Sequence, residues 1–173
     1  MTGGVSTQYY TTPVARLDLM SELEQKSILS IPCPTFPDTP PRPGPPLHER
    51  RVAIVSTGGL HLRHDPPFSL RTAGDDAFPG DYRVIPGDIT AAELVMSHAS
   101  VNFDRTGFQQ DWNVVFPVDR LTELVEAGHI GSVARFHYSF MGAAPPAQIE
   151  DHARRLAGLL RADAVDAVLL VPI

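Results

Sequence analysis

Residues 50–60 read RRVAIVSTGGL, and this stretch contains the pattern that decides the fold. Val52–Val55 is a short apolar run of mostly β-branched residues, which is typical of a strand buried on both faces. The run ends in Ser56-Thr57-Gly58-Gly59. Two glycines after a buried strand permit positive φ and let backbone amides approach an anion. The stretch therefore predicts a buried strand followed either by a ligand-holding turn or by a tight exit that binds nothing.

The sequence on the C-terminal side of this strand alternates between strand and helix patterns. We expect a loop at 65–80, a strand at 81–88, a strand or helix at 91–100, a polar loop at 98–113, a helix with its exit at 116–133, a turn at 137–146, a helix at 147–165 and a strand at 166–173. This order predicts an α/β fold whose mostly parallel sheet has flanking helices. Such sheets bind ligands at the carboxyl ends of their strands. We expect both Thr57-Gly58-Gly59 and Ile173 at that edge.

The first fifty residues differ in character from the remainder. Apolar residues near helical spacing predict a short amphipathic helix at 17–29, and residues 31–47, IPCPTFPDTPPRPGPPL, are rich in proline and indicate extended chain. That chain is either a free linker or an arm laid across another subunit. The expected division is thus an N-terminal helix and Pro-rich arm at 1–50, followed by an α/β domain at 51–173.

Composition narrows the function classes. The chain has 173 residues and a formal net charge of −6, and no basic cluster indicates nucleic-acid binding. Its single cysteine, Cys33, cannot form an internal disulfide and has no local group that would activate it, so we expect a reducing cytoplasm and an inert thiol. The sequence shows neither a signal-peptide pattern nor an apolar run of membrane-spanning length, so we expect neither secretion nor membrane insertion.

A histidine pair in the loop after the first strand suggests metal binding. His61 and His64 lie three residues apart, beside Asp65, and zinc accepts neutral imidazoles as ligands. No third or fourth ligand follows at a recognisable spacing. We therefore expect no metal and interpret these side chains as polar loop residues, either near a ligand or facing solvent.

Two further stretches carry groups suited to chemistry. Residues 97–113 combine His98, Asn102 and Asp104 with aromatic residues, which indicates a packed loop that frames a site or bonds only to backbone. In HYSFMG (137–142), His137 beside Tyr138 could act as acid and base near neutral pH, or form a hydrogen-bonded turn. The residues alone leave both pairs of alternatives open.

Three blocks together resemble a known family. They are VAIVSTGGLHLRHDPPF (52–68), SHASVNFDRTGFQQDWNVVFPVDRLTELVEAGHIGSVARFHYSFMG (97–142) and DAVLLVP (166–172). Over residues 51–173 the chain resembles the selenoprotein B family of glycine, sarcosine, betaine and D-proline reductases, with the D-proline reductase type nearest. The resemblance implies reductive cleavage of a carbon–heteroatom bond in a small amino-acid-like substrate. It also implies a cysteine or selenocysteine nucleophile after the strand at 166–172, regenerated by a dithiol such as a thioredoxin-like donor.

The chain departs from that family because no nucleophile follows Pro172-Ile173. We favour a split enzyme, in which a second polypeptide carries the C-terminal half with its nucleophile. Termination at a selenocysteine codon and loss of the catalytic half are the alternatives. The resemblance further allows a pyruvoyl group on a partner, with no cofactor on this chain itself. The rival functions are a non-catalytic binding or scaffold subunit, and reuse of the frame for other sulfur or carbon–heteroatom chemistry.

On this reading the chain is a component of a heteromeric, cytoplasmic reductase, and its loops frame the substrate. We hypothesise roles for the motif residues only. The catalytic candidates are His137, Tyr138 and His61, and the substrate-binding candidates are Thr57, Gly58, Gly59, His98, Asn102 and Asp104.

Overall fold

The computed structural model describes residues 17–30, 34–35, 37, 43–68, 80–99, 103 and 105–173. The chain divides into two compact units, Met1–Pro37 and Asp38–Ile173, so the division falls within the Pro-rich stretch. In the first unit, a 3-10 turn η1 (Leu17–Leu19) precedes helix α1 (Glu22–Leu29), which confirms the helix expected at 17–29. Cys33 and most of the expected arm lie outside the described residues.

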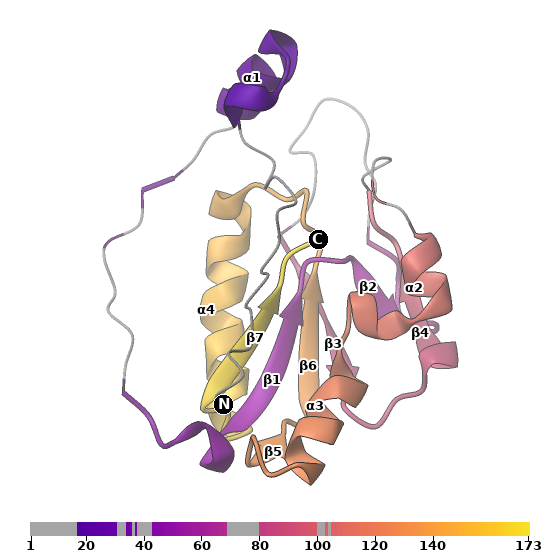
Figure 1. The fold of residues 1–173 in the computed structure, drawn as a ribbon, viewed down its shortest axis with the longest axis vertical. Coiled ribbons are helices and arrows are strands. Elements are labelled where there is room, and N and C mark those ends of the chain that lie inside the picture. The colour runs from indigo at the N-terminus through magenta and orange to yellow at the C-terminus, as the bar shows by residue number, and fades with distance from the viewer. Residues whose placement is uncertain are drawn as a thin grey trace, which may run out of the picture. The chain divides into compact units, whose positions relative to one another are not determined.

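The second unit is built on a five-stranded sheet (Figure 1). Its central strand β1 (Arg51–Ser56) pairs in parallel with β5 (Ser132–Val133), β6 (Phe136–Phe140) and β7 (Ala167–Val171). Strand β3 (Tyr82–Pro86) runs antiparallel on the outer side of β6. The mostly parallel α/β sheet predicted from the sequence is therefore confirmed.

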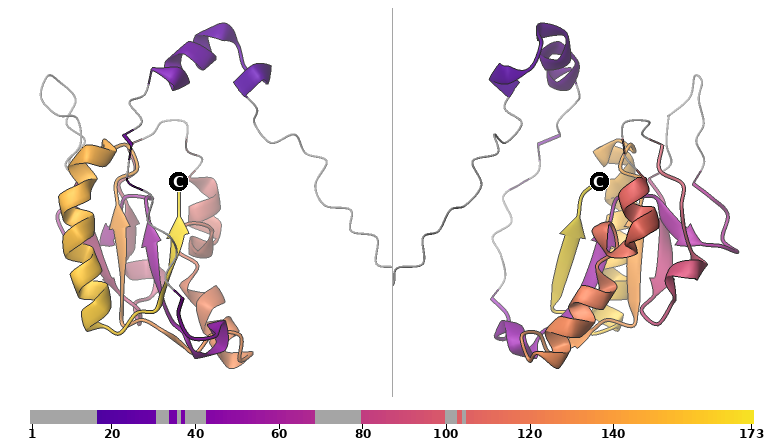
Figure 2. Two further views of the ribbon diagram at one scale, coloured as in Figure 1. Left: turned by 90° about the vertical axis from the view of Figure 1, so that its left-hand side faces the viewer. Right: turned by 45° about the vertical axis from the view of Figure 1, so that its right-hand side comes forward.

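Helices cover both faces of this sheet (Figure 2). Helix α4 (Pro146–Ala162) lies on one face, where Leu156 packs with Tyr138 and Phe140. Helices α2 (Thr106–Gln110) and α3 (Val118–Glu126) lie on the other, where Leu121 and Phe116 join the apolar core. Short 3-10 helices η2 (Leu47–Glu49), η3 (Ala91–Glu93) and η4 (Trp112–Val114) complete the described helical elements. No described helix has both the length and the apolar content to cross a bilayer.

A second, two-stranded antiparallel sheet lies beside the main one. Strand β2 (Leu60–Leu62) pairs with β4 (Leu94–Met96), so that Leu60 faces Met96 across the ladder. The sequence did not predict β2, whose three residues are too few to show a period. The segment left open as strand or helix at 91–100 contains both, because η3 leads directly into β4.

Two expectations about loops were wrong. Residues 137–146 were expected to be a turn, but they begin with strand β6. All side chains of β6 except Phe136 are buried, so the polar–apolar alternation of a half-exposed strand is absent. The polar loop expected at 98–113 contains α2 and η4, which are too short for helical periodicity to be visible.

Candidate active site

The carboxyl ends of β1, β6 and β7 meet at one residue, Thr57. Its N–H donates to Val171 O at 3.0 Å, and its carbonyl accepts from the N–H of Gly142 at 2.9 Å. Its hydroxyl oxygen Oγ1 accepts from the N–H of Ile173 at 2.8 Å. The structure thus brings the turn after β1 and the end of β7 to the same edge of the sheet, as Figure 1 shows by the position of the C-terminus. In open α/β sheets this edge is where ligands bind.

The glycine turn is held tightly by the protein itself. The N–H of Gly58 donates to Ser56 Oγ at 3.1 Å, and the N–H of Gly59 donates to Phe140 O at 2.9 Å. Gly59 has a φ of +65°, and a Cβ there would lie 2.7 Å from Cε of Met141. Because both glycine amides and that of Thr57 are already bonded, the geometry favours a tight strand exit over an amide cradle for an anion.

His98 lies directly after β4 and reaches this edge. It is 4% exposed, and its ring packs against Phe103 with 5.2 Å between ring centroids. Burial lowers the pKa of His98 below its usual value, the charge of Arg105 lowers it further, and a hydrogen bond to the Gly58 backbone opposes the shift. Its Nδ1 is buried and has no hydrogen-bond partner among the described residues. The lowered pKa favours the neutral form of the His98 imidazole, which lies beside the turn with an Nδ1 that no described residue bonds.

His61 lies on β2 with both ring nitrogens engaged. Nδ1 is 2.8 Å from Leu62 O, and Nε2 is 2.8 Å from Ser97 Oγ. His64 is instead a solvent-facing side chain, 3.8 Å from the carboxylate of Asp65. The structure does not bring the two histidines together. Within the described ranges, no group of three histidine, cysteine or acidic side chains is placed to hold a metal ion.

His137 and Tyr138 belong to β6 and point to opposite faces of the sheet. The His137 ring contacts Phe116 on the α3 side, with centroids 5.4 Å apart, while Tyr138 packs beneath α4 against Tyr82. The side chains therefore do not form the adjacent pair that HYSFMG suggested. Burial lowers the pKa of His137 to about 4, although the charge of Asp163 opposes that shift. His137 is consequently neutral at pH 7.

The remaining candidates divide between the edge and the part of the chain that is not described. Thr57, Gly58, Gly59 and His98 lie together at the carboxyl edge. Asn102 and Asp104 lie outside the described residues. His61 is joined to this group through Ser97, whose N–H donates to Gly59 O at 2.9 Å.

A polar cluster that the sequence analysis missed lies at the opposite edge. The buried carboxylate of Asp163 accepts bonds from Arg51 Nη2 at 2.8 Å, from Arg135 Nε at 3.1 Å and from the Arg135 backbone N–H at 2.8 Å. Burial alone would raise the pKa of Asp163, but the bonds to Arg135 and Arg51 outweigh it and lower that pKa. An acidic residue directly after a long amphipathic helix was the available signal. The cluster joins α4 to the amino ends of β1 and β6.

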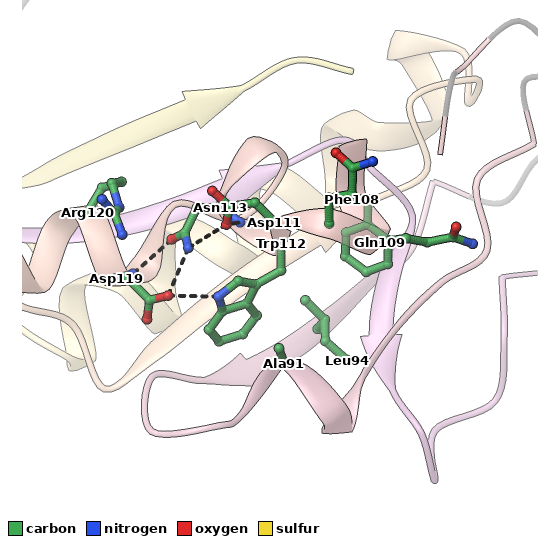
Figure 3. A pocket seen from close by; sticks show the side chains of 10 residues that line it. Ala91, Leu94, Phe108, Gln109, Asp111, Trp112, Asn113, Asp119 and Arg120 are labelled. Atoms are coloured by element: carbon green, nitrogen blue, oxygen red, sulfur yellow. Dashed lines mark hydrogen bonds between the residues drawn. The ribbon is translucent and has the colours of Figure 1, made fainter. Parts of the chain in front are cut away.

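A polar hollow of about 590 Å³ lies between η3 and the segment from α2 to α3. Figure 3 shows Trp112, Asn113 and Asp119 at its wall. Trp112 Nε1 and Asn113 Nδ2 each donate to Asp119 Oδ2 at 2.8 Å. These side chains satisfy one another and secure the start of α3.

Comparison with known proteins gives the family to which this α/β domain belongs. The model of the glycine/sarcosine/betaine reductase selenoprotein B family matches residues 18–172, and the chain belongs to that family. No solved structure matches.

Three curated relatives illustrate the similarity. The D-proline reductase subunit gamma of Acetoanaerobium sticklandii is 34% identical over 140 residues, covering 78% of this chain and 54% of that subunit. The glycine reductase complex component B subunit gamma of Carboxydothermus hydrogenoformans is 29% identical, covering 81% and 32% respectively. The sarcosine reductase complex component B subunit beta of Peptoclostridium acidaminophilum is 29% identical, covering 68% and 27%. The chain spans about half or less of the relatives it matches.

Proposed function

We propose that this chain is the substrate-framing part of a thiol- or selenol-dependent reductase acting on a small amino-acid-like substrate. The proposed nucleophile is a cysteine or selenocysteine on a second polypeptide that carries the C-terminal half. Family membership supports the reductase class, and subunits of D-proline, glycine and sarcosine reductases are among the relatives. The partial coverage of those relatives supports a further half outside this chain.

The proposed reaction is a two-electron reductive cleavage. The thiolate or selenolate attacks the substrate, the carbon–heteroatom bond breaks, and the heteroatom leaves with its electron pair and takes up a proton. A dithiol then supplies two electrons and a second proton, is oxidised to a disulfide and releases the nucleophile. The net change is R–X plus a dithiol giving R–H, H–X and a disulfide. The residues of this chain bind and orient the substrate, while two electrons pass from the dithiol through the nucleophile to the substrate carbon, which is reduced as the dithiol is oxidised.

The observation that carries the proposal is the buried Nδ1 of His98, which has no hydrogen-bond partner in the described part of the chain and lies at the edge where three strands end. A Cβ at Gly58 would lie 3.5 Å from the Ile173 side chain, and the His98 ring bonds to the Gly58 backbone. His98 and the end of β7 therefore share Gly58 as a neighbour. A neutral imidazole nitrogen accepts a hydrogen bond from an ammonium group. We assign His98 to hold the amino group of the substrate, with Asn102 and Asp104 on the following segment as further substrate ligands.

Reconstitution tests this function. We would express the chain with a polypeptide comprising the part of the A. sticklandii D-proline reductase subunit gamma that this chain does not match, with cysteine replacing any selenocysteine. The mixture is given dithiothreitol and D-proline, glycine, sarcosine or betaine, and the cleaved product is measured. We expect product with at least one substrate from the pair, and none from either polypeptide alone. Product from this chain alone, or none from the pair on any substrate, would refute the proposal.

A non-catalytic scaffold subunit is the second candidate. Two of the three predicted catalytic side chains have structural bonds, because His61 bonds to Ser97 and His137 bonds to the backbone of Ile54. Such a subunit would form the same complex, yet substitution at His98 would leave turnover unchanged. The His98 variant described in the Discussion therefore separates the two candidates.

A further inference from the structure

Strand β7 is the outermost strand on its side of the sheet. In the part of the chain that the structure describes it pairs only with β1, from Val52 opposite Ala167 to Ser56 opposite Val171. Its other edge has no described strand beside it, and β7 is the outermost of the drawn strands on that side in the right-hand view of Figure 2. Exposed strand edges carry unpaired N–H and C=O groups, which are ready to pair with another strand.

The side chains of β7 are apolar on both faces of the sheet. Leu170 lies opposite Val55 on the α4 side and is 70% exposed, while Leu169 lies opposite Ile54 on the α3 side and is 38% exposed. The sequence of β7 is AVLLV, without a charge or a proline. Natural edge strands are usually protected by such residues. Apolar residues on both faces are instead the mark of an interior parallel strand.

This edge leads directly to the candidate active site. Val171 and Ile173 both bond to Thr57, so a strand laid parallel to β7 would also end beside Thr57. A second copy of this chain could not produce that arrangement by two-fold symmetry, because two β7 strands related by a two-fold axis between them run antiparallel. Their Thr57 edges would then lie at opposite ends of the joint sheet. The geometry therefore argues against a two-fold-related second copy as the occupant of this edge.

We propose that the outer edge of β7 is the docking surface for the second polypeptide, which adds a parallel strand with a helix on each face. This inference rests on the proposed function for the identity of the partner. The relatives supply the necessary length, since the chain covers only 54% of one and 32% of another. The added strand covers the backbone edge, and its helices cover Leu170 on one face and Leu169 on the other.

The experiment combines hydrogen exchange with sedimentation on the full chain, using the same A. sticklandii polypeptide as the probe. We expect a one-to-one complex and at least tenfold slower exchange of amides in 167–171 when the probe is present. Leu170→Lys should raise the Kd at least tenfold, because it places a charge in the interface. Val114→Lys is the matched control, since Val114 is 58% exposed and lies on η4. It should change the Kd less than twofold.

Each other outcome is decisive. Absence of a complex, a complex without protection of 167–171, or a dimer of this chain that Leu170→Lys dissociates would each overturn the inference. Unfolding of Leu170→Lys in urea should match the wild type, because the side chain is mostly exposed. A protected β7 in a complex without reductase activity would uphold this docking surface while refuting the proposed function.

Discussion

The backbone N–H of Ile54 donates to Nδ1 of His137 at 3.0 Å. Strand β1 pairs with β5 at Arg51 and Val52 and with β6 at Val55 and Ser56, and the imidazole lies between these two short ladders. It supplies the acceptor that a strand carbonyl would otherwise provide. Because Nδ1 accepts, the proton of the neutral ring is on Nε2, which has no partner among the described residues.

The buried His137 makes stability depend on pH. Its pKa is lowered from 6.5 to about 4, so between these two pH values the unfolded chain binds a proton at His137 that the folded chain does not bind. The stability from the neutral ring is fully present above pH 6.5, is lost as the pH falls toward 4, and amounts to about 3 kcal/mol. We expect urea unfolding at pH 7 and pH 4.5 to show this loss. His137→Gln should lose markedly less between the two pH values, and parallel losses would contradict the assignment.

Asp163 should contribute to stability through its bonds to Arg51 and Arg135. Asp163→Asn removes the charge and part of the acceptor set from a buried site, so we expect a loss of about 2 kcal/mol in the free energy of unfolding. The control is Glu150→Gln, which breaks the exposed pair with Arg154 and should cost less than about 0.5 kcal/mol. Equal effects would show that the Asp163 cluster does not join α4 to the sheet.

Alanine substitutions at two glycines with positive φ distinguish the cost of backbone strain from the cost of steric crowding. Gly59 (φ +65°) and Gly128 (φ +71°) have similar backbones, but a Cβ has no atom within 4 Å at Gly128 and lies 2.7 Å from Met141 Cε at Gly59. Gly128→Ala should cost about 1 kcal/mol. Gly59→Ala should cost at least about 1 kcal/mol more, because Met141 and the Ser97 carbonyl must move. Chemical denaturation of both variants measures the difference, and equal costs would show that the turn relaxes freely.

Substitution of Tyr138 tests whether it forms an acid–base pair with His137, its neighbour in the sequence. It is buried beneath α4, and burial raises its pKa above the usual value. We expect Tyr138→Phe to leave the turnover of the reconstituted complex within threefold of wild type, because the hydroxyl is on the opposite face from His137. A tenfold or greater fall in turnover, with unfolding unchanged, would assign Tyr138 a role as proton donor.

The sequence predicted the elements with a visible period and missed those without one. The apolar run at 52–55 and the amphipathic patterns of α3 and α4 were sufficient for the fold class and for the carboxyl edge. Strand β6 was missed because His137 and Ser139 are buried on one face while Tyr138 and Phe140 are buried on the other. The adjacency of His137 and Tyr138 in the sequence also suggested an acid–base pair, although the side chains of neighbouring residues in a strand point to opposite faces of the sheet. The use of the Gly58 and Gly59 amides within the protein depends on long-range contacts that no local pattern shows.

The effect of His98→Gln on the dithiol-dependent kcat/KM of the reconstituted complex tests the central claim most directly. Glutamine keeps a polar side chain but does not place an acceptor at the position of Nδ1, and His64→Gln on the exposed loop is the control. We predict that His98→Gln lowers kcat/KM at least tenfold, while His64→Gln stays within twofold and both variants unfold like the wild type. A value of kcat/KM for His98→Gln within twofold of wild type would contradict the account, because the edge at Thr57 would then not frame the substrate.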